Sequence, residues 1–472
     1  MKTLLKSSLL LALFSVSLFA QAGSVGLTDP VSTAMGKTYT TMSRGIYAIG
    51  INPANLALSD AGHVEAVILP PNLSFRLGTD FMTINDYNYF FGGATNPSGS
   101  KVGRFLNNSD KDRMRELFKD GGMIFFDMTS LDLGFTYKPS EKFGAFGFTV
   151  QDVFSTKFNF PSGIIDIALD GNPVGSEYNF NDFRLKSWYV RTYTFAYARN
   201  LNELFPKTFK SLSVGVSYKY VAGFAYAGLE KNTLILKTNA DRTITETTDL
   251  AFRTSVSPDF GVTYDFDSTA ATKTSSFSAF PKTAGSGSAF DIGFAAEVND
   301  KLSFGLALTD IGSITWKQQT AEYTSKSTFT VSDVSDSAQR KALTDSIKIK
   351  GRYISEFKTN MPTCLRIGAT YIFAPNLFKL AADINIGFND NPRNEKAARF
   401  SLGGEWNPLK WLPYLRGGFS FGGEDVFSWS VGLGLNIGPI EFSAAAPDFQ
   451  YIFTPKEGKR ISCAFGWRWR FH

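Results

Sequence analysis

The sequence predicts an all-β fold, a transmembrane antiparallel β-barrel of about 14 strands preceded by an N-terminal plug segment. Three observations support this fold class. Apolar residues alternate with small or polar ones, the N-terminus resembles an export signal, and aromatic residues are abundant although mean hydropathy is near zero. Alternate residues of a strand lie on opposite faces, and in a membrane barrel one face meets lipid and the other the lumen.

The last predicted strand shows the alternation most clearly. In residues 461–471 the odd-numbered positions are apolar or aromatic, and the even-numbered positions are Ser, Ala, Gly or Arg. A soluble sandwich would bury the aromatic row in its core, whereas a membrane barrel turns it to lipid. The N-terminus favours the barrel, because it predicts export.

Residues 1–22 are predicted to be a cleaved signal peptide. Lys2 and Lys6 flank the start of an apolar run, and Ala20-Gln21-Ala22 fits the small-x-small rule for cleavage. A membrane anchor is the alternative, which the shortness of the run disfavours. No later stretch is long and apolar enough to span as a helix, so a membrane-spanning chain must be a barrel. The expected location is the outer membrane of a Gram-negative cell.

The composition agrees with a barrel and disfavours nucleic acid as a partner. The chain has 45 Phe, 18 Tyr, 7 Trp and 42 Gly, with a mean hydropathy of −0.09. Half the residues of a barrel strand face a polar lumen, which keeps this mean low. The net charge of +5 falls to +3 when Lys2 and Lys6 leave, and there is no dense basic block. Cys364 and Cys463 fall on opposite faces by parity, so no disulfide is expected.

Fourteen strands are placed by the alternation. They are residues 63–78, 122–138, 142–158, 184–199, 209–226, 287–298, 301–316, 361–374, 377–390, 396–407, 411–422, 427–438, 439–447 and 459–471. Short connections follow even-numbered strands. The long connections, 79–121, 159–183, 227–286 and 317–360, follow odd-numbered ones. Barrels of this class have short periplasmic turns and long outer loops, so residues 63–472 are expected to form a barrel whose N-terminus is periplasmic.

Two of the long connections have a distinct character. Residues 266–288 are rich in Ser, Thr, Ala and Gly and are expected to be flexible. Residues 109–120 are expected to form a helix, with Ser109 as the N-cap and Asp112 three positions on. Its residues Met114, Leu117 and Phe118 share one face. That face either offers a docking surface or packs on the barrel's own rim, and the second interpretation is favoured.

Residues 23–62 precede the first strand and consist mainly of small residues. Such a segment either hangs in the periplasm or folds inside the lumen, where its backbone would need polar partners. Pro53 restricts Asn52 to extended geometry, and the pair favours a turn.

Several motifs carry a family resemblance. They are Met35-Gly36, Ser43-Arg44-Gly45, Asn52-Pro53-Ala54-Asn55-Leu56-Ala57, Asp86-Tyr87 and parts of residues 291–316. They resemble the FadL-type long-chain fatty-acid transporter superfamily of outer-membrane barrels, and most closely an uncharacterised, domain-of-unknown-function branch of it. PorV-type proteins, which serve secretion and surface attachment, are related to the same group.

The resemblance implies a barrel plugged by an N-terminal hatch, residues 23–62, and the passage of hydrophobic molecules, sometimes sideways through the wall. Arg44, Gly45, Asn52, Pro53 and Ala54 would belong to the hatch. Transporters often have Gly at the position of the following residue, Asn in this chain, and PorV-type relatives have another task. The fold therefore leaves two functions open.

The C-terminus resembles the signal recognised by the barrel-assembly machinery. Gly466, Trp469 and Phe471 fit a Gly-x-x-aromatic-x-aromatic pattern. His472 extends past the usual terminal aromatic, and Ala464 stands where a polar residue is common. The resemblance implies that this machinery is a partner during assembly.

The residues that carry chemistry in enzymes are sparse, so an enzyme is not expected. The two histidines are His63 and His472, and neither falls mid-strand, where a barrel lipase would hold the base beside its nucleophile. Clusters of His and Cys with metal-ligand spacing are absent from the sequence. Asp110, Asp112 and Asp120 lack the spacing of a calcium loop and are interpreted as a solvated face. No cofactor is expected.

Lys219, Arg468 and Arg470 are predicted to face the lumen. They either attract an acyl carboxylate or pair with lumen acids such as Glu405 and with plug carbonyls, and pairing is favoured. A further set of aromatic residues near strand ends is predicted to form an interfacial girdle. The set is Trp406, Trp411, Tyr414, Trp467 and Trp469.

The predicted function is diffusion of hydrophobic, fatty-acid-like molecules through a gated lumen. The expected partners are outer-membrane lipid, a hydrophobic ligand and the barrel-assembly machinery. The alternative is a non-transporting surface scaffold or secretion component of the PorV type.

Overall fold

The computed structural model describes residues 29–471 apart from short gaps. The gaps are 204–208, 265, 267–271, 274–277, 279, 334–335, 340, 343–349, 410–411 and 424–425. The expected signal peptide, Trp411 and His472 lie outside the described residues. Across the described part of the chain, every helix is too short or too polar to cross a membrane.

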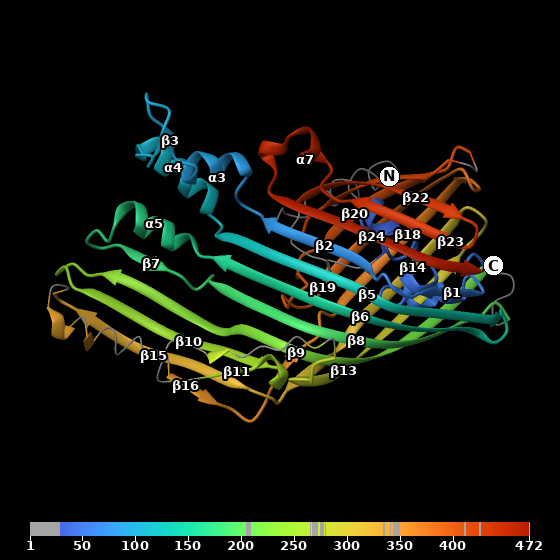
Figure 1. Ribbon diagram of the computed structural model, residues 1–472, viewed down its shortest axis with the longest axis horizontal. Helices are drawn as coiled ribbons and strands as arrows, with labels where there is room; N and C mark the ends of the chain where they lie inside the picture. The colour runs from blue at the N-terminus through green and yellow to red at the C-terminus, as the bar shows by residue number, and fades with distance from the viewer. Residues whose placement is uncertain are drawn as a thin grey trace, which may run out of the picture.

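One closed antiparallel barrel of 14 strands forms the body of the protein (Figure 1). Its wall consists of β1 (Val64–Val67) with β2 (Asn72–Thr79), β5 (Gly122–Ser140), β6 (Gly144–Phe160), β8 (Arg184–Asn200), β9 (Ser211–Thr238), β13 (Gly285–Glu297), β14 (Leu302–Trp316), β18 (Cys364–Ala374), β19 (Phe378–Gly387), β20 (Arg399–Trp406), β21 (Tyr414–Phe421), β22 (Phe427–Ile437), β23 (Ile440–Ala446) and β24 (Arg460–Phe471). β2 pairs with β24 on one side and β5 on the other, which closes the barrel. The predicted fold class is confirmed.

The first wall strand is in two pieces, whereas the sequence predicts one strand over 63–78. Residues 68–71 loop outward between β1 and β2, and Leu69 is 75% exposed. Pro70 and Pro71 have no N–H to donate to the ladder, which accounts for the break. Next to this break the buried Asn72 donates to the Tyr47 hydroxyl (3.0 Å) and accepts from the backbone N–H of Trp467 (2.8 Å).

The two faces of the wall differ as the alternation predicts. On β9 the side chains of Ser217 and Lys219 are buried, while Tyr218 and Tyr220 are 42% and 41% exposed. The outward rows of the other strands expose large apolar side chains to a similar extent. This belt far exceeds the apolar patches of a soluble monomer. Cys364 is buried, whereas Cys463 is exposed.

Connection lengths divide the barrel into two ends. Short turns such as 140–144, 297–302 and 437–440 lie at one end, with the start of β1 and the finish of β24. We call this the short-turn end and the opposite one the long-connection end. The predicted segregation of long and short connections is confirmed.

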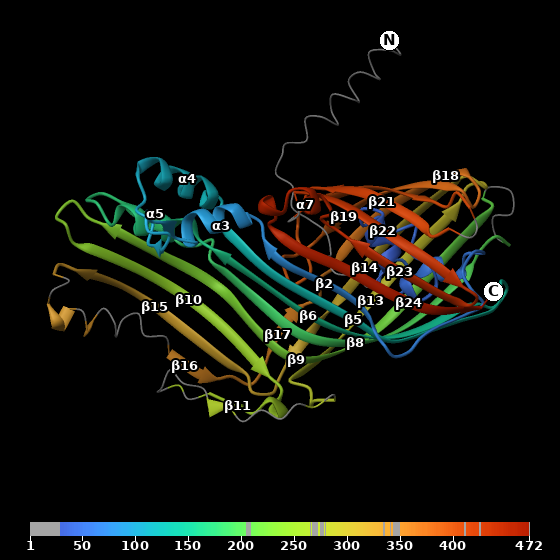
Figure 2. The same cartoon turned by 45° about the horizontal axis from the view of Figure 1, so that its top comes forward.

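Part of the wall continues beyond the barrel at the long-connection end (Figure 2). β9 runs to Thr238 and pairs with β10 (Ile244–Val256), which pairs with β15 (Ala321–Val331). The expectation of plain loops over 227–286 and 317–360 is therefore wrong for these strands. Polar side chains interrupt the more apolar row of both strands, Glu246 and Thr248 on β10 and Ser325 and Ser327 on β15, so an alternation search misses them. Most of 266–279 lies outside the described residues, and the chain is in β13 from Gly285.

Smaller elements complete the connections. The short strands are β3 (Ala94–Thr95), β4 (Lys101–Val102), β7 (Glu177–Asn179), β11 (Val262–Thr263), β12 (Thr272–Lys273), β16 (Lys350–Tyr353) and β17 (Phe357–Asn360). The helices outside the barrel are α3 (Ile84–Phe91), α4 (Asn108–Phe118), α5 (Ser162–Asp170), α7 (Gln450–Phe453), η3 (Pro258–Phe260) and η4 (Pro455–Glu457).

Helix α4 corresponds to the helix predicted over 109–120, but its cap differs. Asn107, not Ser109, is the N-cap, and it forms a capping box with Asp110. Asn is as good a cap as Ser, and its capping box also uses a carboxylate three positions on. Met114 and Phe118 pack with Phe90 of α3. The favoured interpretation, packing on the protein's own rim, is confirmed.

Candidate functional site

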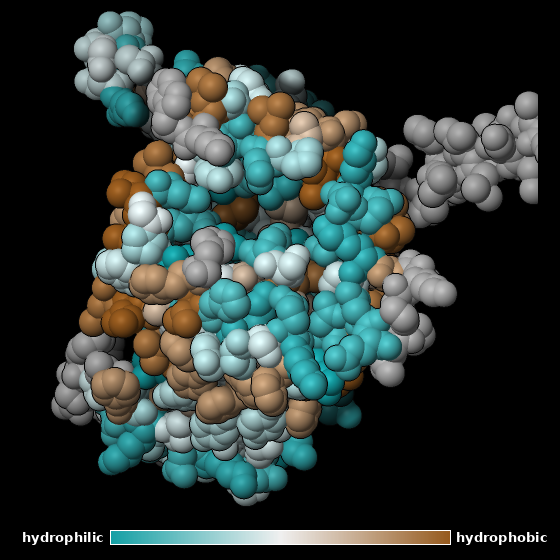
Figure 3. Space-filling view, turned by 90° about the vertical axis from the view of Figure 1, so that its right-hand side faces the viewer, coloured by the Kyte–Doolittle hydropathy of each residue, from teal (hydrophilic) through white to brown (hydrophobic). Residues whose placement is uncertain are grey.

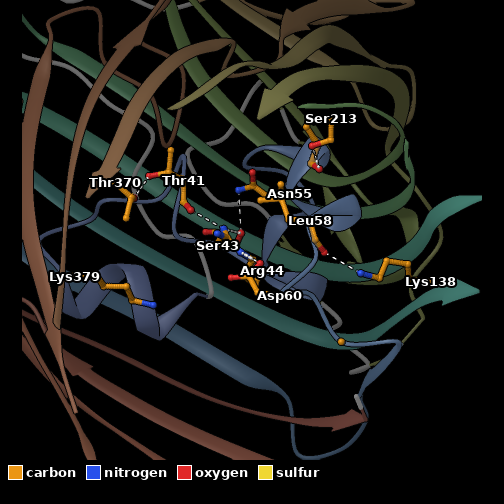
Figure 4. A network of polar contacts seen from close by, with 12 residues as sticks. Thr41, Ser43, Arg44, Asn55, Leu58, Asp60, Lys138, Ser213, Thr370 and Lys379 are labelled. Carbon is orange, nitrogen blue, oxygen red and sulfur yellow. Dashed lines mark hydrogen bonds and ion pairs between the residues drawn. The ribbon is translucent and has the colours of Figure 1, made fainter. Parts of the chain in front are cut away.

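The N-terminal segment, residues 29–62, lies inside the barrel (Figure 4). It contains α2 (Pro30–Ala34), η1 (Gly45–Ala48) and η2 (Pro53–Ala57). α2 packs against β21 to β24, and η2 packs against β5, β6, β8, β9 and β13, on the other side of the barrel. From residue 29 to residue 58, Val31, Arg44 and Gly50 are partly exposed and the rest are buried. The segment thus bridges opposite sides of the lumen.

A buried carboxylate organises the start of the segment. Asp29 caps α2 by accepting hydrogen bonds from the N–H groups of Val31 (2.9 Å) and Ser32 (3.3 Å). The hydroxyls of Ser32 and Ser43 also donate to it, at 2.6 and 2.7 Å. Burial raises the pKa of Asp29 above its ordinary value, and the two hydroxyl hydrogen bonds oppose that rise.

Hydrogen bonds from five wall strands hold the segment. They join Thr40 N and Oγ1 to Asp383 Oδ2 (2.7 Å each), Thr41 Oγ1 with Thr370 Oγ1 (2.6 Å), Asn52 Nδ2 to the Phe294 carbonyl (3.0 Å), Ser213 Oγ to the Ala54 carbonyl (3.0 Å) and Lys138 Nζ to the Leu58 carbonyl (3.0 Å). These bonds satisfy backbone groups that would otherwise be buried without partners. Each is individually modest, so the segment is held by many weak ties.

The Asn52-Pro53-Ala54 motif shapes the middle of the segment. Asn52 is extended, with φ −146°, as the following proline requires, and its Oδ1 accepts from the Ala54 N–H (3.2 Å) to cap η2. The next residue, Asn55, donates to the carbonyls of Thr40 (2.9 Å) and Ser43 (3.0 Å). The two asparagines therefore fold the segment back on itself.

The wall lies very close to this motif at Gly215 of β9. A Cβ there would lie 2.4 Å from the backbone of Pro53 and Ala54. At Gly417 of β21 the nearest atom to a Cβ would be 3.8 Å away. Gly215 therefore permits a contact that no other residue allows.

We expect Gly215→Ala to lower stability by about 1–3 kcal/mol, the usual cost of overpacking a filled interior. Gly417→Ala is the matched control, since it makes the same change in a strand with room for a methyl group. Denaturant unfolding of lipid-reconstituted protein would measure both. Equal midpoints for the two variants would show that the segment does not pack on β9.

Arg468 and Arg470 tie the segment to the short-turn end. The Arg468 guanidinium contacts Glu65 (3.0 Å) and Glu441 (2.9 Å), and donates to the Arg44 carbonyl (2.7 Å). Arg470 pairs with Glu65 (3.3 Å) and donates to the Asp60 carbonyl. Both cations lie among lumen acids and carbonyls of the segment.

Arg44 and Gly45 form the segment's half of this contact. The Arg44 Nε lies 2.6 Å from Asp60 Oδ1. Gly45 has φ +56°, and a Cβ there would lie 1.7 Å from Glu65 Oε2. The Ile46 N–H donates to the same carboxylate oxygen (3.0 Å). Glycine is thus required on both backbone and steric grounds.

Lys219 lies further from the short-turn end than Arg468 and Arg470, in a separate ion cluster. Its Nζ is 2.8 Å from Asp291 and 2.6 Å from Asp310. Asp310 has φ +58°, and the β13–β14 register shifts beside it. Glu405, named as an expected partner of the lumen cations, instead pairs with Lys379 (2.9 Å) and Arg416 (2.6 Å). That example is wrong because those two cations come from the strands next to Glu405.

A second segment crosses the lumen beyond the first. Residues 388–398 connect β19 to β20 and reach the opposite wall, where Lys186 of β8 donates to Asn391 Oδ1 (2.9 Å). Asn391 donates to the Asn360 carbonyl (2.7 Å), and Asn394 to the Thr363 carbonyl (2.9 Å). We call residues 388–398 the inward connection. The sequence did not predict it, because a polar connection gives no sign of which way it turns.

Cavities remain on both sides of the N-terminal segment. A cavity of about 540 Å³ at the short-turn end is lined by charged residues that include Arg44, Asp60, Lys379 and Glu405. Figure 3 looks onto this end, where hydrophilic residues surround a recess. A smaller cavity of about 40 Å³ lies beyond the segment, lined by both charged and apolar residues, which include Lys219, Asp310 and Trp188.

An apolar cluster adjoins the smaller cavity. Its members are Val153, Trp188, Val190, Val221, Tyr226, Ala284, Ala289, Ile314, Trp316, Phe357 and Met361. The ring centroid of Tyr226 lies 5.4 Å from those of Trp316 and Phe357. Beyond the segment the described lumen thus holds this apolar cluster next to the ion cluster of Lys219. The sequence did not predict this cluster, because its members come from six strands and meet only through the register of those strands.

The remaining predicted residues have plain structural positions. Gly466 faces the segment, where a Cβ would lie 2.7 Å from the Tyr47 hydroxyl. Trp469 and Phe471 pair with β1 at the short-turn end, and their recognition by the assembly machinery stays a prediction. Trp406 is the last residue of β20, and Tyr414 is the first of β21.

The residues considered for chemistry have structural partners. The His63 Nδ1 lies 2.9 Å from the Lys138 carbonyl oxygen. Asp110 accepts from the Tyr89 hydroxyl, and Asp112 pairs with Arg115 (2.6 Å). Among the residues that the structure describes, no group of three or more His, Cys, Asp or Glu side chains could hold a metal ion.

The fold and the site together define the class of protein: a closed antiparallel β-barrel whose lumen holds its own N-terminal segment. Residues 53–446 match the model of a family of unknown function (DUF5723), and the chain belongs to this family. The predicted membership of an uncharacterised branch is confirmed. No curated protein matches this chain.

Several solved structures are similar in fold. The P. putida toluene transporter TodX has 12% identity and a TM-score of 0.44, covering 94% of this chain and 98% of its own. The CymD monoaromatic hydrocarbon channel has 12% identity and a TM-score of 0.44, covering 95% and 98%. A Pseudomonas aeruginosa FadL homologue has 12% identity and a TM-score of 0.44, covering 96% and 100%. Because these identities and TM-scores are low, the fold rests on the strand pairing of this chain itself.

Proposed function

We propose that this protein is an outer-membrane barrel through which small hydrophobic, fatty-acid-like molecules diffuse, gated by its N-terminal hatch. The observation that carries the proposal is the N-terminal segment in the lumen. It lies between an apolar cluster and a charged cavity, and many modest hydrogen bonds hold it to the wall. In the proposal, residues 1–22 direct export and are removed, and residues 23–62 form the hatch.

The belt of outward apolar side chains supports a position in a membrane. Such a belt is stable against acyl chains and would cause aggregation in water. Short turns are periplasmic in barrels of this class, so the charged cavity would open to the periplasm. A hydrophobic molecule would then meet the apolar cluster first and the hatch second.

The hatch residues have separate proposed roles. Arg44 and Gly45 would fix the hatch to Glu65 and Asp60, and Asn52-Pro53-Ala54 would fix it to β9 and β13. Lys219, Arg468 and Arg470 would act as structural cations, because each lies among carboxylates at ion-pair distance. An acyl carboxylate would have to displace these partners.

A reversible cross-link tests the gate. Thr41 of the hatch and Thr370 of β18 have their hydroxyl oxygens 2.6 Å apart, so Thr41→Cys with Thr370→Cys should form a disulfide (Figure 4). Cys364→Ala and Cys463→Ala remove the native thiols. In cells lacking their own fatty-acid transporter, we expect the oxidised variant to lose uptake of a radiolabelled long-chain fatty acid and a reductant to restore it.

Thr41→Cys alone is the matched control, since it cannot be cross-linked to the wall. Peptide mass spectrometry would confirm the disulfide. Equal uptake in the oxidised and reduced states would contradict gating by the hatch. Uptake no greater than in cells without the protein would contradict transport itself.

A second candidate function is a surface scaffold or secretion component of the PorV type. The observation that favours it is the outer sheet, since β9, β10 and β15 continue well beyond the barrel. Such a platform suits a protein partner better than a small molecule. Stoichiometric protein partners on purification, with no bound acyl chains by mass spectrometry, would favour this function over transport.

A further inference from the structure

Helix α3 turns an apolar face away from the protein. Ile84, Tyr87 and Phe91 are 50%, 57% and 57% exposed, and spacings of three and four residues place them on one face. Phe90, about a quarter turn around the helix from that face, is buried against α4. A surface helix in water normally turns its apolar side chains to the core and polar side chains to the solvent, whereas α3 exposes apolar ones.

Helix α7 lies against the outside of the barrel wall. Trp429 belongs to the outward row of β22, and the rings of Phe449 and Phe453 lie 5.5 and 5.9 Å from it. Ile452 and Phe453 are nevertheless 61% and 66% exposed. The connection 447–459 therefore folds back over the apolar belt and presents new apolar surface on its far side.

The start of α3 is hydrogen-bonded to the chain that follows α7 and η4, beside the same strands. The Ile84 N–H donates to the Gly458 carbonyl (3.0 Å), and Lys459 donates to the Asp80 carbonyl (2.9 Å). Figures 1 and 2 show α3 and α7 side by side at the long-connection end of β2 and β24. The outward row of these strands leads up to them through Leu77 and Ile461, which are 45% and 69% exposed.

We infer that this apolar collar, Ile84, Tyr87, Phe91, Ile452 and Phe453, inserts among the acyl chains of the outer leaflet. The inference rests on the proposed membrane position of the barrel. Proximity to the outward rows of the wall identifies the occupant, because α7 packs on Trp429 of β22 and α3 is the next helix after β2. Large exposed apolar side chains on a short helix are the pattern of elements that lie in a membrane interface.

The collar has a structural consequence. It would hold the connections 80–92 and 447–459 on the membrane, beside β2 and β24. The outer sheet of β9, β10 and β15, which carries exposed polar and charged residues such as Lys326 and Thr328, would project into water on the other side. The long-connection end would thus have one side anchored in lipid and one side free.

Fluorescence quenching by lipid tests the inference. Tyr87→Cys and Phe453→Cys, each in a Cys364→Ala, Cys463→Ala background, would carry an NBD label in phosphatidylcholine vesicles containing doxyl-labelled acyl chains. The lipid-side control is Phe400→Cys on the outward row of β20, where the side chain is 49% exposed. The water-side control is Thr328→Cys, exposed on β15. We expect quenching at 87 and 453 close to that at 400 and well above that at 328.

The outcomes separate the inference from the proposed function. Strong quenching at 400, with 87 or 453 no more quenched than 328, would overturn the collar and leave the membrane barrel standing. A protein partner as the true occupant would give that same result in the purified protein. Absence of quenching at 400 would overturn the proposed membrane position, and the collar with it.

Discussion

Removal of residues 23–57 is expected to turn an electrically silent barrel into a conducting pore in planar bilayers. The deletion takes away the segment that bridges the lumen and leaves wall rows of Ser, Thr, Lys and Arg, which water and ions would wet. The inward connection, residues 388–398, remains in place, so the expected conductance is below that of an empty barrel of this size.

The deletion needs a folding control, because the segment supplies partners to buried wall residues such as Asp383 and Glu65. Heat-modifiable migration in detergent gels would select the folded fraction. A milder variant, Asn52→Ala with Asn55→Ala, keeps the segment and removes five of its hydrogen bonds. We expect brief openings from it. A folded deletion variant as silent as the full chain would refute the hatch.

The barrel was predictable because one physical rule, lipid outside and lumen inside, repeats along every wall strand. Residues 461–471 and β9 up to Tyr220 carry that rule in plain form. The outer sheet escaped because Thr245, Thr247 and their neighbours lie on a strand with no lipid face. The break at 68–71 was not predicted, because the side-chain pattern does not show that a proline pair cannot donate hydrogen bonds to the neighbouring strands.

Parity alone predicted the lumen side of Lys219, Arg468 and Arg470, but it could not name their partners. Arg468 meets Glu65 across 403 positions of sequence, and this contact depends on closure of the barrel between β24 and β1. The Asn52-Pro53-Ala54 motif marked the segment that lies in the lumen. That the wall would approach it at Gly215 depends on a register that only the assembled sheet fixes.

Replacement of Arg468 is expected to give the largest loss of stability among single substitutions where the N-terminal segment contacts the short-turn end. Arg468→Met removes the cation from between Glu65 and Glu441 and the donor from the Arg44 carbonyl. Arg470 still contacts both carboxylates, at 3.3 and 3.7 Å, but one cation then faces two buried anions. Breaking a buried ion pair in this way costs about 3–5 kcal/mol.

Urea unfolding of lipid-reconstituted protein would measure that loss, with two comparisons to assign its cause. Arg468→Lys retains the charge and loses the forked geometry, so a smaller loss is expected. Adding Glu65→Gln and Glu441→Gln to Arg468→Met removes the stranded anions and should recover part of the stability, because the penalty comes from uncompensated buried charge rather than from the missing contacts. A triple variant less stable than Arg468→Met would reverse that reasoning. It would place the energy in hydrogen bonds that the two carboxylates make to the hatch, including the one that Glu65 accepts from Ile46.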